Sequence, residues 1–373
     1  MCLGQSPGLQ PEGKKRLSWQ TLFGAIELEE QSFRRKENGR QFRPFSLRAG
    51  VGSRSYSRPL QRALTDFGAD VPFAEVVKKM REHYGLEVSA SAARQITETH
   101  AERMREQQED RLIGHLGPEA GWDRIIAEAD GSLVPIVRQD AADSAPDADR
   151  RKQKELIWRE ARLCLAHEPG QLSARYAATL GDVESTGARW LDCVARAGAG
   201  SRTKIHCVGD GAAWIAMQAR HSFGTQASYL VDFHHVSEYL NAAAACIAPT
   251  GTANWRREQQ ARLKENDLDA VLAELRPHLE SAQTPDAEAP VKVCHRYLSN
   301  QREHLDYRNA LAQCLPIGSG EVESRHRYVI QARLKRPGAW WKEENAEKML
   351  ALRVNRANNE WESYWQQQRQ ARC

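Results

Sequence analysis

The sequence lacks the features that mark several protein classes. Its eight cysteines are scattered, and none forms a Cys-x-x-Cys motif, so neither a zinc ribbon nor a disulfide framework is expected. No apolar run approaches the roughly 20 residues that cross a bilayer. The first residues also lack the apolar core of a secretory signal. We therefore expect a cytoplasmic protein, and 373 residues are enough for two or three domains.

Charge is unevenly distributed along the chain. The net charge is only +4. However, Lys14 to Arg62 holds 12 Lys/Arg against 4 acids, and Ser324 to Cys373 holds 11 against 5. Two basic segments on either side of a neutral middle are typical of surfaces that face phosphates. Ordinary solvated faces would give the same pattern, so charge alone leaves both interpretations open.

We expect residues 1–115 to form an N-terminal DNA-binding region, and the pattern of residues 72–107 within it predicts two helices joined by a short turn. After Pro72, apolar residues recur with helical spacing until Gly85, and Ser89 can cap a second helix that runs to about Gln107. This pattern is typical of a helix-turn-helix, and a plain αα-hairpin is equally compatible. In the first case Arg94, Gln95 and Thr97 would point outward toward DNA bases.

The middle of the chain changes to the two-residue period of strands. The predicted order is three strands, a helix, a strand, a helix and a strand, which describes a ribonuclease H-like α/β core over residues 120–235. A helical insertion over 236–315 and a closing helix with a basic tail over 316–373 complete the chain. The strand candidates are 124–130 with a second apolar run at 133–137, 156–166, 175–180, 204–209 and 227–231.

Three acidic residues stand where such a core would bring them together. Asp130 and Asp210 each follow a predicted strand and precede a glycine, and Glu323 lies in the first turn of the closing helix. Phosphodiester chemistry with two metal ions needs carboxylates at one spot. Glu321 is the alternative third acid, because two residues of separation turn the two glutamates about 200° apart.

Other residues have two interpretations each. The closing helix is dense in basic side chains that would suit phosphates. Asp232 and His235 would form either a metal pair or, as we prefer, a hydrogen bond that fixes a turn. Trp255 would be a core residue or a platform for an unpaired base. The basic side chains are Arg325, Arg327, Arg333, Lys335 and Arg336.

Together these motifs resemble bacterial insertion-sequence DDE transposases of the ISKra type, which are related to Mutator-like transposases. The resemblance covers residues 40–365. It is carried by Arg43-Pro44-Phe45, Tyr56-Ser57, Leu60–Leu64, Ala127–Gly131, Val208–Trp214, Asp232–Leu240, Leu315–Ser324 and Arg333–Trp340.

The resemblance implies catalytic and metal-binding Asp130, Asp210 and Glu323, with two Mg²⁺ or Mn²⁺ ions as cofactor. It also matches Asp232 and His235 to an Asp-x-x-His signature of the Mutator-like relatives. Relatives often carry paired cysteines near the N-terminus, whereas the stretch from Ser32 to Arg40 here has none. We therefore expect no structural zinc.

The expected activity is cleavage at the ends of a mobile element and joining of the freed 3′-hydroxyls to target DNA. The partners would be double-stranded DNA, read at terminal inverted repeats, and a second protomer, since two ends must be paired. This places the protein in the cytoplasm at the nucleoid. Two alternatives are a ribonuclease H-like nuclease or resolvase without strand transfer, and an inactive DNA-binding protein derived from a transposase.

Overall fold

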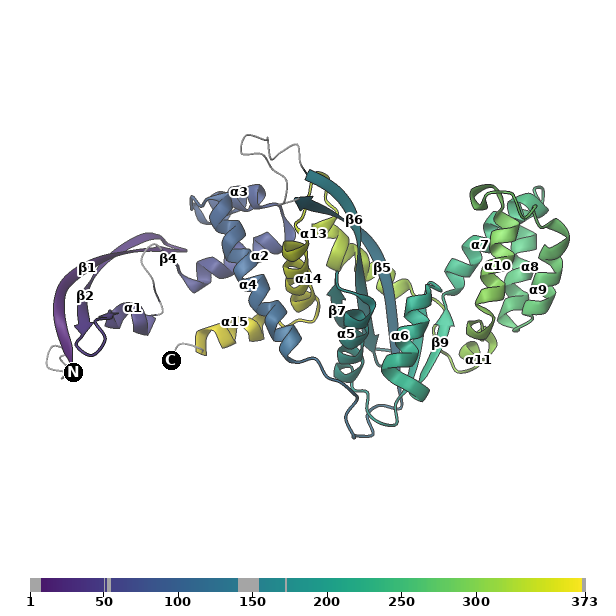
Figure 1. Cartoon of the computed structure of the whole chain (residues 1–373), viewed down its shortest axis with the longest axis horizontal. Helices are drawn as coiled ribbons and strands as arrows, with labels where there is room; N and C mark the ends of the chain where they lie inside the picture. The colour runs from purple at the N-terminus through teal and green to yellow at the C-terminus, as the bar shows by residue number, and fades with distance from the viewer. Residues whose placement is uncertain (1–7, 50, 52–54, 140–153, 172, 371–373) are drawn as a thin grey trace. The chain divides into compact units, whose positions relative to one another are not determined.

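The computed structural model describes residues 8–49, 51, 55–139, 154–171 and 173–370 (Figure 1). The chain forms two compact units. Unit 1 consists of Met1–Gln107 and Ala351–Cys373, and unit 2 of Gln108–Leu350. Both ends of the chain thus belong to unit 1, and the segment 316–373 is divided between the units. Within the described residues, no helix has the length and apolar character needed to cross a membrane.

Unit 1 begins with a small antiparallel layer. β1 (Leu9–Thr21) and β2 (Gly24–Arg35) form a hairpin, and β3 (Gln41–Phe42) and β4 (Ser55–Tyr56) complete the order β3-β2-β1-β4. The turn of this hairpin is Leu22-Phe23, and Gly24 after it has a φ of 103°.

The two helices predicted within 72–107 are present in unit 1, and two helices that were not predicted precede them. They are α1 (Pro44–Ala49), α2 (Arg58–Asp70), α3 (Phe73–Tyr84) and α4 (Ala90–Asp110). Gly85 ends α3 with a φ of 64°, and the Ser89 hydroxyl accepts a hydrogen bond from the Ala92 amide at 3.0 Å. Their shared core consists of Leu60, Leu64, Val76, Met80 and Ala93. α14 (Glu343–Ala357) ends in unit 1, and α15 (Trp361–Gln370) belongs to it.

Unit 2 is built on a five-stranded sheet in the order β7-β6-β5-β8-β9. β5, β8 and β9 are parallel, whereas β6 is antiparallel to both of its neighbours. The strands are β5 (Arg124–Gln139), β6 (Lys154–His167), β7 (Arg175–Thr179), β8 (Lys204–Gly209) and β9 (Ala227–Val231).

The prediction that the first strand ends at Asp130 was wrong. β5 continues to Gln139 because β6 pairs with it along its whole length, from Ile126 opposite His167 to Gln139 opposite Lys154. The two apolar runs are therefore one strand, and Asp130 lies inside it. Asp130 marks a different boundary, since the pairing of β5 with β8 stops just before it.

One face of this sheet is covered by α5 (Val183–Arg196) and α6 (Ala213–Phe223). Alternate residues of β5, Ile125, Ala127 and Ala129, belong to a core cluster with Trp190 and Val194 of α5. The period of two then places Glu128 and Asp130 on the opposite face. α12 (Gly320–Arg325) packs against β5 and β6 and continues through a π-helical turn (His326–Gln331) into α13 (Ala332–Leu334).

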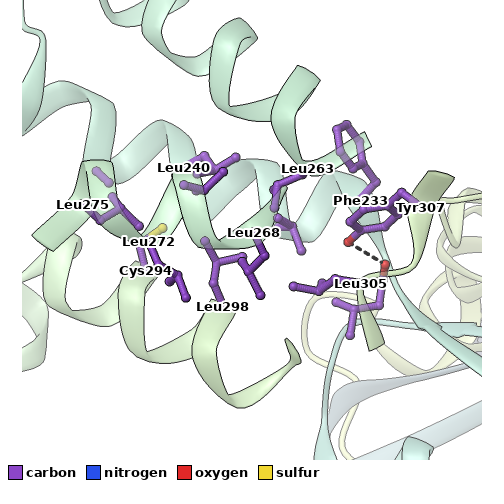
Figure 2. Packing of buried hydrophobic residues seen from close by; sticks show 14 of the residues in the cluster. Phe233, Leu240, Leu263, Leu268, Leu272, Leu275, Cys294, Leu298, Leu305 and Tyr307 are labelled. Atoms are coloured by element: carbon purple, nitrogen blue, oxygen red, sulfur yellow. Dashed lines mark hydrogen bonds between the residues drawn. The ribbon is translucent and has the colours of Figure 1, made fainter. Parts of the chain in front are cut away.

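The segment between β9 and α12 is helical, as its sequence pattern predicts. It contains α7 (Phe233–Ile247), α8 (Thr252–Lys264), α9 (Leu268–Leu275), α10 (Pro290–Asn300) and α11 (Tyr307–Ala312). Figure 2 shows leucines of several of these helices turned toward one interior, and the Tyr307 hydroxyl donates to the Val231 carbonyl at 3.0 Å. Trp255 is 9% exposed within this cluster, so it is a core residue.

Candidate active site

Strand register places Asp130 and Asp210 side by side. β5 and β8 are parallel, with Arg124 opposite Lys204 and Glu128 opposite Val208. Asp130 and Asp210 are each two residues beyond this last pair and on the same face. β8 ends at Gly209, so Asp210 lies where the chain leaves the sheet, beside a strand that continues.

The Asp130 carboxyl is partly enclosed, with 24% of its side chain exposed. Its Oδ1 accepts a hydrogen bond from the Gly131 amide at 2.7 Å. Burial raises its pKa to about 6, and the negative charges of Asp210, Glu323 and Glu160 add to this increase. Asp130 therefore lies within electrostatic range of both other acids of the predicted triad.

Asp210 is held mainly through its main chain. Its Oδ1 accepts from the Ala212 amide at 2.8 Å. From α10, Tyr297 donates its hydroxyl to the Asp210 carbonyl at 2.7 Å, and Gln301 donates to the Gly211 carbonyl at 2.8 Å. Gly211 has a φ of 89°, and a Cβ there would lie 2.5 Å from the Tyr297 hydroxyl. The segment around α10 thus fixes the Asp210 loop, which requires glycine at 211.

The first turn of α12 carries two glutamates that are solvent-exposed and one valine that is buried between them. Glu321 and Glu323 are exposed, and Val322 between them is buried. Glu321 lies 3.3 Å from Nε2 of His167 on β6. Glu323 is the α12 acid whose charge acts on Asp130. The two candidate third acids therefore have different neighbours.

Glu128 is a buried acid that the sequence analysis did not single out. It is 2% exposed, and its carboxylate accepts a hydrogen bond from the Val322 amide at 2.8 Å. Its pKa is raised to about 8, mainly by burial and also by the charges of Glu321, Asp232 and Glu323. Its position two residues before Asp130, hence on the same strand face, is the signal that would have found it.

His326 is the second residue that the sequence analysis missed. It is 2% exposed, and its Nε2 lies 3.2 Å from Oδ2 of Asp130. Burial lowers the pKa of its imidazole to about 4, so the ring is neutral at neutral pH. Only the packing of the π-helical turn against β5 reveals this proximity, and no local sequence pattern encodes it.

Asp232 joins three segments near this centre. One carboxylate oxygen accepts from the His234 and His235 amides at the start of α7, and the other accepts from the Ser319 amide and hydroxyl just before α12. Its own amide donates to the Gly209 carbonyl at 2.7 Å. Asp232 therefore makes the turn-fixing hydrogen bonds that the sequence analysis weighed against a metal pair.

His235 does not share these side-chain contacts. Its Nδ1 lies 3.5 Å from Glu238, and its ring packs edge-on against Tyr239 and Tyr297. Its link to Asp232 is the amide hydrogen bond at the start of α7, at 3.2 Å.

The acidic centre suits a hard cation by its chemistry. In the described part of the chain, no three His, Cys, Asp or Glu side chains lie close enough to form a preassembled metal cage. Mg²⁺ is commonly held by one or two carboxylates, with waters and substrate phosphates in its other positions. The repulsion that raises the pKa of Asp130 is the kind that a bound cation relieves. Asp130, Asp210 and Glu323 would be the residues to hold it.

Of the basic residues predicted to contact DNA, Arg333 does not lie on the surface, so its prediction was wrong. It is 3% exposed, and its guanidinium lies 4.7 Å from the centre of the Trp341 ring, because α13 turns it inward. Arg327 and Lys335 are exposed, whereas Arg325 and Arg336 are partly buried. Arg325 lies over the ring of Tyr176.

In unit 1, the start of α4 presents two of its three predicted base-reading residues. Arg94 and Gln95 are exposed. Thr97 is the exception, because it is 0% exposed, and its hydroxyl donates to the Leu64 carbonyl at 3.3 Å. Since Thr97 packs against Gly68 of α2, the prediction that it contacts DNA was wrong.

Comparison with known proteins gives one family. Residues 182–369, just over half of the 373, match the model described as Uncharacterised protein family (UPF0236). The matched part includes Asp210 and Glu323 and begins after Asp130. No curated protein matches the chain. On the extent of the family match, the chain belongs to the uncharacterised protein family UPF0236.

Proposed function

We propose that this protein is a DDE-type DNA transposase of the ISKra type. The observation that carries the proposal is the grouping of acids in unit 2. The β5–β8 register sets Asp130 beside Asp210, and the charges of Asp210 and Glu323 both act on the Asp130 carboxyl. Asp130, distant in sequence from Asp210 and Glu323, is thus within reach of both charges, and such a grouping of acids suits phosphodiester cleavage with divalent metals.

The fold assignment belongs to the same proposal. The sheet order β7-β6-β5-β8-β9, with only β6 antiparallel, supports a ribonuclease H-like core. The helices between β9 and α12 would then be an insertion between the second and third acids. The third acid would be Glu323, because its charge acts on Asp130 while Glu321 lies beside His167.

In this proposal the acids hold Mg²⁺ or Mn²⁺, and two such ions would supply Lewis-acid stabilisation of the attacking and leaving oxygens. Tyr297 and Gln301 keep the Asp210 loop in place. Glu128 fixes the start of α12 on β5 through the Val322 amide. Water attacks the phosphorus at the element end, which yields a 3′-hydroxyl and a 5′-phosphate, and that 3′-hydroxyl attacks a target phosphodiester.

DNA recognition would fall to α3 and α4, with Arg94 and Gln95 toward the bases. Arg327 and Lys335 would contact phosphates close to Glu323. Because two element ends must be paired, the acting form would be a dimer or larger assembly on DNA.

The test uses Asp130→Asn and Asp210→Asn in the full chain. We expect each variant to bind DNA that carries the element ends like the wild type and to cleave it at least about 10³-fold more slowly, because each loses a metal-holding charge. Glu238→Gln, an exposed acid of α7, is the matched control. Unchanged cleavage in both aspartate variants would refute the proposal.

Pre-cut element ends then separate the related activities. A transposase joins them to target DNA. Cleavage without joined product would identify a nuclease, and wild-type binding without cleavage would identify an inactive DNA-binding protein.

A further inference from the structure

The imidazole of His326 has an unusual environment for a buried side chain. It is 2% exposed, and among the described residues it has no side-chain hydrogen-bond partner of normal geometry, although the Asp130 main chain lies within hydrogen-bonding reach. Leaving a buried polar group unpaired is energetically unfavourable. Yet Nε2 lies 3.2 Å from Oδ2 of Asp130. A buried imidazole that lacks a well-formed side-chain hydrogen bond and lies beside a carboxylate has the environment of a histidine that can bind a metal ion.

The separation of these two atoms fits a shared ion. In an octahedral site with bonds of roughly 2.0–2.1 Å, neighbouring donor atoms are about 3 Å apart. The distance of 3.2 Å between His326 Nε2 and Asp130 Oδ2 is close to this value. Both atoms can therefore bind one cation with little movement of either side chain.

The helix that carries His326 is irregular at this residue. α12 ends at Arg325, and the π-helical turn begins at His326. Single π turns within α-helices often occur at functional sites. Glu323 precedes His326 by three residues, so the two lie on neighbouring parts of one helical surface, and both act on Asp130.

We propose that His326 is a nitrogen ligand of the metal ion that Asp130 holds. This rests on the proposed function, because it assumes a divalent ion in the acidic centre. Nε2 would bind the ion, and Nδ1 would carry the ring proton. An imidazole ligand favours Mn²⁺ over Mg²⁺, because nitrogen donors suit transition metals better than they suit Mg²⁺.

His167 provides a matched control within the same unit. It is also buried, at 7% exposed, and its Nε2 also lies close to an acid, Glu321, at 3.3 Å. Its Nδ1, however, is hydrogen-bonded to the Glu168 carbonyl at 2.9 Å. His167 is thus a buried histidine beside an acid that, unlike His326, has a well-formed hydrogen bond at Nδ1.

The experiment is pulsed EPR on the full chain with ¹⁵N-labelled histidine and added Mn²⁺. We expect a ¹⁵N coupling to bound Mn²⁺ in the wild type, its loss in His326→Gln and its persistence in His167→Gln. Titration followed by EPR should also show Mn²⁺ binding weakened about tenfold or more in His326→Gln.

Two outcomes overturn the inference: Mn²⁺ bound without any histidine coupling, or a coupling that survives in His326→Gln. Failure of the wild type to bind Mn²⁺ would instead refute the metal site of the proposed function, so the two failures are distinguishable. Circular dichroism checks folding. Should His326→Gln unfold, His326→Asn takes its place in the same comparison with His167→Gln.

Discussion

His100 of α4 is a buried imidazole whose folded form is held neutral. It is 3% exposed, and its ring nitrogens lie 2.7 Å from the Tyr364 hydroxyl and 2.8 Å from Oε1 of Gln61. Burial lowers its pKa from 6.5 to about 3, with the charge of Arg103 adding to the effect. The α2, α4 and α15 segments of unit 1 therefore meet at a group that resists protonation.

This predicts acid sensitivity of unit 1. Below pH 6.5 the unfolded chain gains a proton at His100 that the folded chain refuses until about pH 3, so stability falls as pH falls through this range. Between pH 6.5 and 5 the loss should be about 2 kcal/mol. Urea unfolding at both pH values, compared with His100→Gln, measures it. Equal pH dependence of the two proteins would contradict the prediction.

At the scale of elements, α2 and α4 approach closely at a single glycine. A Cβ on Gly68 would overlap the hydroxyl of Thr97 and lie 2.9 Å from its Cγ2. Thr97 is fully buried and hydrogen-bonded to the Leu64 carbonyl, so it has no room to move aside. The contact therefore depends on the absence of a side chain at residue 68.

We predict that Gly68→Ala destabilises unit 1 by about 1–3 kcal/mol through overpacking. The double variant Gly68→Ala, Thr97→Ala should recover part of this loss, because it removes the overlapping hydroxyl and methyl. Urea unfolding of both variants and of Thr97→Ala alone provides the comparison. A single variant as stable as the wild type would show that the helices separate freely.

The exposed start of α4 gives a second element-scale prediction. If α3 and α4 read DNA, Arg94→Ala and Gln95→Ala should each weaken binding to the element ends by about 1–3 kcal/mol while leaving nonspecific binding nearly unchanged. Fluorescence anisotropy with matched and scrambled duplexes measures this, with the exposed Arg202→Ala as control. Equal losses on both duplexes would assign these residues to phosphate contact.

Element prediction succeeded where a segment's partners are local or its pattern is strong. The limits of β8 and β9 match the predicted ones because compact apolar runs end at Asp210 and Asp232. The length of β5 was underestimated, since residues 131–139 are held by pairing with β6. Thr97 and Arg333 were assigned to the surface, but packing against other elements buries both, and that packing is not visible in a local pattern.

On the scale of the whole molecule, unit 1 is closed by residues from the far end of the sequence. Arg353 is 2% exposed and pairs with Asp70, and it also donates to the Ala69 carbonyl at 3.3 Å. Arg356 on the same helix pairs with the same Asp70 but is more exposed. Composition and charge indicated only that this end is basic, and nothing local indicates that it packs with α2.

Arg353→Ala should therefore destabilise unit 1 by about 2–3 kcal/mol, since it removes a buried cation and its hydrogen bonds. Hydrogen exchange should accelerate in α2 to α4 and α15 and stay unchanged in β5 to β9. Arg356→Ala, with its more exposed pair, should cost less than about 1 kcal/mol. Faster exchange spread over both units would mean that the molecule unfolds as one.

In the candidate site, too, some residues can be predicted from the local sequence pattern, whereas others depend on tertiary packing. Asp130 and Asp210 were predictable as neighbours because both follow parallel-strand residues with matching register. Glu128 and His326 were not, since their burial arises only when α12 and its π-helical turn pack on β5.

The hydrogen bonds from Tyr297 and Gln301 couple the position of the Asp210 loop to that of α10. Tyr297 and Gln301 donate hydrogen bonds to two successive carbonyls, and because residue 211 is glycine, no side chain separates the loop from Tyr297. A shift of α10 by about the length of one hydrogen bond would therefore move this loop and change the position of Asp210 relative to Asp130.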